Sequence, residues 1–179
     1  MHRILSFPTG AALLLLAACQ PSNKPQPLTG ADSTAILKIA TDYAAAWNKG
    51  NVDGVLSLYT ADAVRQLPDT VALKGANAIR TQLNTAMGTP MRPTLNIQTT
   101  TIVGRQDLAV GAGTFTLTPP APPAPAKGAA PAAPAPIVGK WLNVTMKQAD
   151  GHWKAVFDAV TYDAPRPAPE AAKPARRGR

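Results

Sequence analysis

Several residue types are scarce in this sequence, and each shortage excludes a class of function. The chain has one cysteine, Cys19, and two histidines, and 5% of its residues are aromatic. A single cysteine excludes an internal disulfide, and because Cys19 precedes the predicted domain it also excludes a thiol catalyst there. His2 lies in the N-terminal segment and His152 at a predicted hairpin tip. We therefore expect no histidine–aspartate dyad in the domain.

Motifs for metals and cofactors are missing as well. Histidine, cysteine and carboxylate side chains do not cluster at the spacing of metal ligands, so no metal site is expected. The sequence contains no phosphate-binding loop, dinucleotide fingerprint or nucleophile elbow. We therefore expect no cofactor.

Acidic residues are fewer than basic ones, and the basic excess lies at the ends of the chain. Ten acidic residues face eighteen basic ones, which gives a formal net charge of +8. Residues 32–163 hold nine acidic and eleven basic residues, so this region carries only +2. Residues 164–179 are rich in proline and alanine and are predicted to form a disordered basic tail. Two interpretations remain for the tail: a solvated segment, or a contact with anionic lipids of the envelope.

The N-terminus has the features of a secretory signal. A basic start that includes Arg3 precedes an apolar run that is shorter than the roughly 20 residues of a transmembrane helix. The tetrapeptide Leu16–Cys19 resembles the bacterial lipobox, so residues 1–18 are predicted to be removed as a signal peptide and Cys19 to carry lipid such as palmitate. An ordinary signal peptide with a chance cysteine is the alternative. Gln20, where aspartate would favour inner-membrane retention, favours an outer-membrane anchor that faces the periplasm. Nucleic acid is not an expected partner of such an exported chain.

Two further segments are too rich in proline to form regular structure. Residues 19–31 are polar and proline-rich, and are predicted to be the lipidated N-terminus and a tether. Residues 118–137 consist almost wholly of proline and alanine and interrupt the domain that spans 32–163. Proline lacks an amide donor and favours extended polyproline II structure, so we expect an exposed insertion. It is either a spacer or an arm that binds a partner.

The periodicity of the remaining residues predicts helices first and strands afterwards. A helix capped by Asp32 or Ser33 should end at Gly50, a short one should follow Asn51, and a third should follow Gly75. Short extended pieces are expected at 63–67 and 70–74, and longer strands at 94–103, 108–118, 139–148 and 152–162. Gly111 and Gly113 suggest a bulge or bend. This order predicts an α+β fold in which the helices pack on one face of a curved antiparallel sheet.

Four segments follow one another along the chain: Tyr43–Asp53, Leu58–Val64, Gly75–Ile79, and Trp153–Asp158 with the preceding Asp150-Gly151. In this order they resemble the SnoaL-like and ketosteroid-isomerase-like families of the nuclear transport factor 2 superfamily. The resemblance implies a cone-shaped antiparallel sheet wrapped around the N-terminal helices, with a pocket at the open end. Members of these families catalyse several reactions or only bind ligands, and many dimerise through the open sheet, so the fold leaves the function undecided.

The resemblance also assigns roles to three positions. The hydrogen-bond donor of ketosteroid isomerases falls on Tyr43, and their carboxylate base falls on Leu67. A third group, a protonated acid, falls near Asn143, which can donate a hydrogen bond without titrating. Leucine cannot accept a proton, so isomerisation by that route is not expected. Asp69 is close to Leu67 but follows a proline and is interpreted as a turn residue.

Asp158 is the candidate that could restore catalysis. If its face of the strand lines the cone, Asp158 is a carboxylate in the pocket. With the opposite parity, Asp158 is solvated, and the inward side chains are Trp153, Phe157 and Thr161. The side chains predicted to line the pocket are Tyr43, Trp47, Leu67, Asn143 and Asp158.

Three functions are compatible with these features. The first is a lipid-anchored, non-catalytic domain of the periplasm that binds a small apolar ligand or a protein partner. The second is an enzyme of isomerase, dehydratase or cyclase type that uses Asp158 and Tyr43. The third is a structural or assembly module that forms a homodimer through its sheet. The sequence identifies neither a ligand nor a reaction.

Overall fold

The computed structural model describes residues 25–122 and 134–164. The predicted signal peptide with Cys19, the middle of the proline- and alanine-rich insertion, and all but the first residue of the basic tail lie outside the described residues. Within the described ranges, no helix is both long enough and apolar enough to span a membrane.

Three helices precede the long strands, as expected. They are α1 (Gly30–Asn48), α2 (Val52–Leu56) and α3 (Gly75–Met87). Asn51 caps α2 by accepting a hydrogen bond from the backbone N–H of Gly54 at 2.9 Å, as predicted. The predicted caps of α1, Asp32 or Ser33, are wrong by three or four residues. Thr29 is the N-cap, and Asp32 closes a capping box by accepting from the Thr29 backbone.

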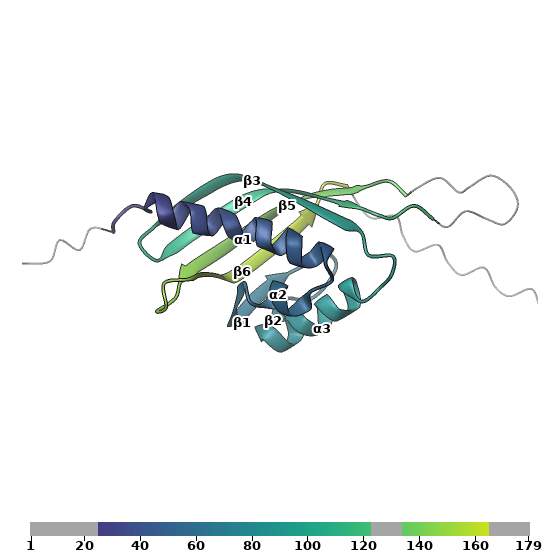
Figure 1. The fold of residues 1–179 in the computed structure, drawn as a ribbon, viewed down its shortest axis with the longest axis horizontal. Coiled ribbons are helices and arrows are strands. Elements are labelled where there is room, and N and C mark those ends of the chain that lie inside the picture. The colour runs from purple at the N-terminus through teal and green to yellow at the C-terminus, as the bar shows by residue number, and fades with distance from the viewer. Residues whose placement is uncertain (1–24, 123–133, 165–179) are drawn as a thin grey trace, which may run out of the picture.

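The strands form one six-stranded sheet. The strands are β1 (Tyr59–Gln66), β2 (Leu73–Lys74), β3 (Thr94–Arg105), β4 (Leu108–Thr118), β5 (Ile137–Lys147) and β6 (Trp153–Tyr162). They lie in the order β2-β1-β6-β5-β4-β3 (Figure 1). The α+β class and the curved sheet are confirmed. The sheet is nevertheless mixed, because β1 pairs with β6 in parallel while the other neighbours are antiparallel.

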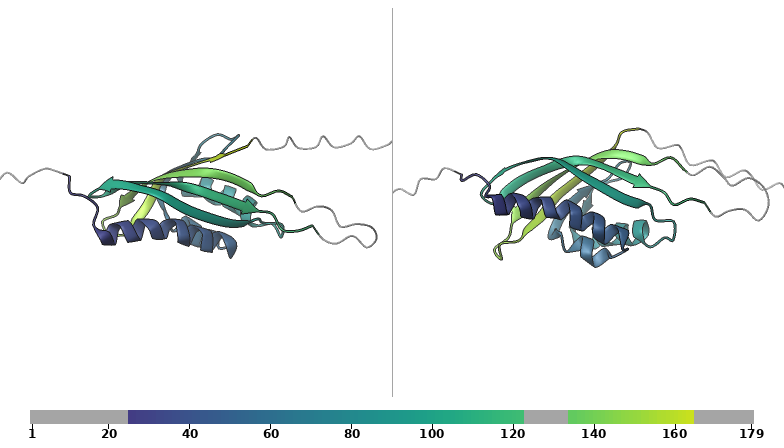
Figure 2. Two further views of the ribbon diagram at one scale, coloured as in Figure 1. Left: turned by 90° about the horizontal axis from the view of Figure 1, so that it is seen from above. Right: turned by 45° about the horizontal axis from the view of Figure 1, so that its top comes forward.

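The sheet bends around α1, which lies along its concave face (Figures 1 and 2). The predicted irregularity near Gly111 and Gly113 is present, since the β3–β4 register shifts between Thr99 and Thr101, opposite Gly113. A Cβ atom on Gly113 would lie 1.9 Å from the carbonyl oxygen of Gln98. Only glycine therefore permits the two strands to approach this closely at the bend.

Two apolar clusters fill the space between helices and sheet. The larger one includes Ile79 and Leu83 of α3, which are fully buried, and side chains from α1, α2 and every long strand. The smaller cluster joins Ile36 and Ile39 of α1 to Trp153 of β6 at the N-terminal end of the helix.

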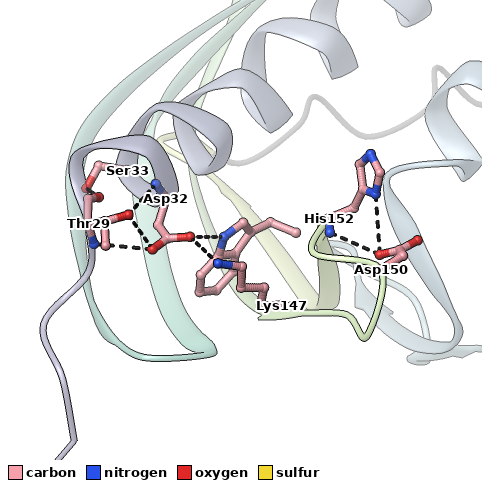
Figure 3. A network of polar contacts seen from close by, with 7 residues as sticks. Thr29, Asp32, Ser33, Lys147, Asp150 and His152 are labelled. Atoms are coloured by element: carbon pink, nitrogen blue, oxygen red, sulfur yellow. Dashed lines mark hydrogen bonds and ion pairs between the residues drawn. The ribbon is translucent and has the colours of Figure 1, made fainter.

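A polar network closes the smaller cluster (Figure 3). Oδ1 of Asp32 accepts hydrogen bonds from Nζ of Lys147 at 2.8 Å and from Nε1 of Trp153 at 3.0 Å. Oδ2 of Asp32 also accepts a hydrogen bond from the hydroxyl of Thr29. Together these bonds hold the pKa of Asp32 well below its usual value. Asp32 therefore joins the start of α1 to the β5–β6 hairpin.

The chain enters the domain along the β3–β4 turn. Pro27 forms an isolated bridge with Arg105, and the N–H of Gln106 donates to the carbonyl oxygen of Gln26 at 2.8 Å. The described end of the predicted tether is thus held at the end of the sheet opposite to the insertion (Figure 1).

Candidate functional site

A cavity of about 380 Å³ lies between α1, α3 and the sheet, at the end of β4 and β5 that carries the insertion. Its wall is mainly apolar. The aromatic side chains on this wall are Tyr43, Trp47, Tyr59, Phe115, Trp141 and Tyr162. The rings of Tyr43 and Trp47 stack with centroids 6.4 Å apart, because the two residues are one helical turn apart on α1.

A polar cluster occupies part of this wall. Nε of Arg65 lies 3.3 Å from Oδ2 of Asp158, and the hydroxyl of Tyr59 donates to the same oxygen at 2.8 Å. Nη2 of Arg65 donates to the hydroxyl oxygen of Tyr43 at 2.8 Å, and Nη1 donates to Oε1 of Gln82 at 3.4 Å. We call Tyr43, Tyr59, Arg65, Gln82 and Asp158 the polar cluster. It connects α1, α3, β1 and β6.

The strand register brings the charged members together. Arg65 on β1 pairs with Asp158 on β6 in the parallel ladder, and Asp158 pairs with Asn143 on β5 in the antiparallel one. Arg65, Asn143 and Asp158 therefore stand side by side across three strands, and all three are buried and line the cavity. A long-range parallel pairing thus creates the buried ion pair.

Burial and neighbouring groups shift the pKa values of Tyr43, Tyr59 and Arg65. Burial raises the pKa of Tyr59 well above its usual value and also raises that of Tyr43, so both phenols stay protonated at neutral pH. Burial alone would lower the pKa of Arg65, but the neighbouring oxygens of Tyr43, Tyr59 and Asp158 outweigh it, and the pKa is raised. Arg65 is therefore a permanent cation within this cavity.

Asn143 has unused hydrogen-bonding capacity. Its Oδ1 is buried without a hydrogen-bond partner among the described residues, close to Gly111, where an added Cβ would lie 2.8 Å from this oxygen. The amide faces a cavity in which Tyr43 also offers a donor. Tyr43 accepts from Arg65, so its own O–H remains to donate to a ligand.

A bulge in β6 explains why neither of the two predicted sets of inward-facing residues on this strand agrees fully with the structure. Val144 of β5 pairs with Phe157, and the next residue, Thr145, pairs with Ala155, so that Val156 is the extra residue. Inward side chains precede the bulge at Trp153 and follow it at Asp158. Trp153 lies in the smaller apolar cluster and Asp158 in the cavity, whereas Phe157 and Thr161 do not line the cavity. Both alternatives assumed one unbroken alternation.

All five predicted pocket residues lie on the cavity wall: Tyr43, Trp47, Leu67, Asn143 and Asp158. Their roles in binding or catalysis stay predictions. Asp69 is an exposed turn residue with a φ of 59° and is not part of the wall. His152 is exposed at the hairpin tip, where Nδ1 lies 3.3 Å from Oδ1 of Asp150 (Figure 3).

Sequence reasoning missed Arg65 and Tyr59. A signal for Arg65 was present, because Arg65 stands two residues before Leu67 in an extended segment, and residues two apart share a face. Assigning Leu67 to the pocket therefore implied Arg65 as well. Tyr59 is the first residue of β1, which begins four residues before the extended piece that the sequence predicts at 63–67.

Among residues 25–122 and 134–164, no group of three or more histidine, cysteine or carboxylate side chains is placed to hold a metal ion.

Comparison with known proteins places these observations in a family. The SnoaL-like domain family matches residues 40–156. A ketosteroid isomerase-like protein from Erwinia carotovora atroseptica SCRI1043 superposes with a TM-score of 0.63 at 19% identity, over 76% of this chain and 100% of that one. An NTF-2-like protein from Shewanella oneidensis MR-1 gives a TM-score of 0.57 at 14% identity, over 72% and 97% of the two chains. No curated protein matches this chain. At these identities the two structures support the fold alone.

Proposed function

Since the chain belongs to the SnoaL-like domain family, we propose that it uses its cavity to bind a small, mainly apolar ligand without transforming it. The observation that carries this proposal is the cavity of about 380 Å³ with aromatic walls and a few buried polar groups. Binding sites for small molecules combine such an apolar wall with a small number of polar groups that orient the ligand.

The polar groups suit recognition of one oxygen on the ligand. The O–H of Tyr43 and the amide of Asn143 both border the cavity, and neither is used up by the hydrogen bonds of the described residues. A ligand hydroxyl could accept from the O–H of Tyr43 and donate its own hydrogen to Oδ1 of Asn143, while the rest of the ligand contacts Trp47 and Trp141. Such a contact would also give the buried Oδ1 of Asn143 a hydrogen-bond partner.

Catalysis of the isomerase type lacks an available base. Leu67 stands where the related isomerases carry a carboxylate. Asp158 is the carboxylate on the cavity wall, but its Oδ2 is already engaged by Tyr59 and Arg65. We therefore favour binding over an enzyme that uses Asp158 and Tyr43.

We also propose that Cys19 carries the lipid anchor and holds the domain at the periplasmic face of a membrane, with the outer membrane favoured. Residues 20–31 then act as the tether. Metabolic labelling with tritiated palmitate tests this directly. Label should appear in the wild type and be absent from Cys19→Ala, and equal labelling of both chains would exclude the anchor.

Titration with N-phenyl-1-naphthylamine, a neutral apolar dye that fluoresces in apolar sites, tests the binding function. We expect a saturable signal with one dye per chain. Ala86→Phe on α3 should fill part of the cavity and weaken binding, because Ala86 lines its wall. Thr85→Phe, on the exposed side of the same helix, is the control and should bind normally. A signal that does not saturate, or that Ala86→Phe leaves unchanged, would refute a ligand site in this cavity.

The outer face of the sheet supports a second candidate function, assembly into a homodimer. A row of apolar side chains crosses four paired strands on the face opposite to the cavity: Val103, Val110, Val144 and Phe157. Leu108 and Met146 pair beside this row and are both exposed. Contiguous exposed apolar surface is typical of an interaction site. Sedimentation velocity should show a dimer that Val144→Lys dissociates and Thr116→Lys leaves intact, and a monomeric wild type would exclude this function.

A further inference from the structure

The charges on the cavity wall balance one another. Among the described side chains that line the cavity, Arg65 and Asp158 carry the formal charges. They are 5% and 8% exposed, and Nε of Arg65 lies 3.3 Å from Oδ2 of Asp158. The wall therefore has no net charge, although it contains a buried cation and a buried anion.

Arg65 and Asp158 both have interaction partners within the protein, so neither needs a ligand to compensate its charge. Asp158 also accepts from the hydroxyl of Tyr59, and Arg65 also donates to Tyr43 and Gln82. Nε of Arg65 forms no hydrogen bond with the described residues, but the two opposite charges already lie 3.3 Å apart, which leaves little for a charged ligand to neutralise.

Ligands of the same shape but different charge should therefore bind differently. An anion that enters the cavity loses its hydration and meets an arginine already paired with Asp158, whose carboxylate repels it. A cation likewise loses its hydration and meets a carboxylate, Asp158, that is already paired with Arg65, whose charge repels it. A neutral hydroxyl or carbonyl avoids both costs, because burying an unpaired ion is far less favourable than burying a hydrogen-bonded polar group.

Building on the ligand-binding function proposed above, we propose that the Arg65–Asp158 pair makes this cavity selective for neutral ligands. The favoured class comprises alcohols, ketones, esters and ethers with an apolar body. Carboxylates and amines of the same shape are rejected.

Calorimetric titration of the full chain with three probes that share one ring system tests this selectivity. The probes are 2-naphthalenemethanol, 2-naphthoate and 2-naphthylmethylamine, which are neutral, anionic and cationic at pH 7. We expect the alcohol to bind tighter than either ion by roughly tenfold or more, since each ion would enter a low-dielectric site without a free partner. Equal affinity for the alcohol and either ion would overturn the proposal.

Substitution of one partner should reverse the preference. Asp158→Asn keeps the shape of the side chain but leaves the charge of Arg65 without its carboxylate. The affinity for 2-naphthoate should then rise by about tenfold or more, because the probe supplies the missing anion. Arg65→Met should favour 2-naphthylmethylamine in the same way. Asp53→Asn is the matched control, since Asp53 pairs with Arg80 on the exposed surface, and it should leave the order of the three probes unchanged.

The result with the wild type keeps the test decisive even if a variant does not fold. If the alcohol binds best and Asp158→Asn prefers the anion, the pair sets the selectivity. If all three probes bind the wild type equally, the cavity binds ligands but the pair does not select them. If none binds, the ligand-binding function itself falls, and the selectivity with it.

Discussion

The buried ion pair makes a strong prediction about stability. Arg65→Met leaves the Asp158 carboxylate in a site where only 12% of its side chain is exposed, and Asp158→Leu leaves the Arg65 guanidinium with 7% exposed. Removing one partner of a buried pair costs about 3–5 kcal/mol, because the remaining charge stays buried without compensation. For a domain of this size, such a loss lowers the melting temperature by roughly 10–20 °C.

The double variant Arg65→Met/Asp158→Leu should recover most of this loss. Replacing both partners with apolar side chains of similar volume is often nearly neutral. Two hydroxyls, those of Tyr43 and Tyr59, lose a hydrogen-bond partner in the double variant. Each such loss costs about 1 kcal/mol, so the double variant should be roughly 2 kcal/mol less stable than the wild type. Simple addition of the single effects predicts a loss of about 6–10 kcal/mol.

Urea unfolding followed by tryptophan fluorescence measures these differences, because Trp47, Trp141 and Trp153 are all buried in the folded chain. The exposed pair of Arg80 and Asp53 is the control, and breaking it should cost less than about 1 kcal/mol. The reasoning fails if each single variant costs under about 1 kcal/mol, or if the double variant loses the sum of the two.

Three further predictions concern the scaffold. Asp32 has a folded-state pKa below its unfolded value, held there by hydrogen bonds from its lysine, threonine and tryptophan partners. The contribution of Asp32 to stability is therefore complete above pH about 4 and is lost as the pH falls further. Urea unfolding should show the wild type to be more stable than Asp32→Asn at pH 7, and this difference should disappear in acid. Ile79→Ala should cost about 2–5 kcal/mol in the same assay because the side chain is fully buried, whereas Leu37→Ala, which is exposed, should have little effect. Gly113→Ala should lower the melting temperature measured by circular dichroism, because a Cβ would collide with a carbonyl oxygen of β3. Gly30→Ala, which has open space around it, should not lower it. Equal melting temperatures for the two variants would contradict the close approach of the strands at Gly113.

The helices and the order of elements were predictable because local patterns determine them. The apolar spacing of α3 and its end before Gly88 agree with the structure, as does the Asn51 cap of α2. The cap of α1 was displaced because Asp32 and Thr29 are both good capping residues, and only the geometry shows that Thr29 caps while Asp32 occupies the third helical position.

The missed features depend on contacts between distant segments. The parallel pairing of β1 with β6 joins Arg65 to Asp158, and no local pattern in either strand announces it. The bulge at Val156 likewise follows from the register of β6 against β5. A single extra residue moved Asp158 to the cavity side while Trp153 stayed inward, which no strict alternation of period two could anticipate.

The energetics of the ion pair separate its effect on stability from its effect on selectivity. An apolar pair at these positions would cost the fold little, so net stability does not account for a buried Arg65 and Asp158. An apolar wall would also reject ions, but it would equally reject a ligand hydroxyl, which would be buried without a partner. The ion pair instead polarises the hydroxyl of Tyr43, through the 2.8 Å bond from Arg65, and leaves its O–H to donate into the cavity. The cavity can thus bind a neutral polar group, which a purely apolar wall would disfavour. Because the charges of Arg65 and Asp158 balance, it disfavours the anion that an unpaired arginine would bind.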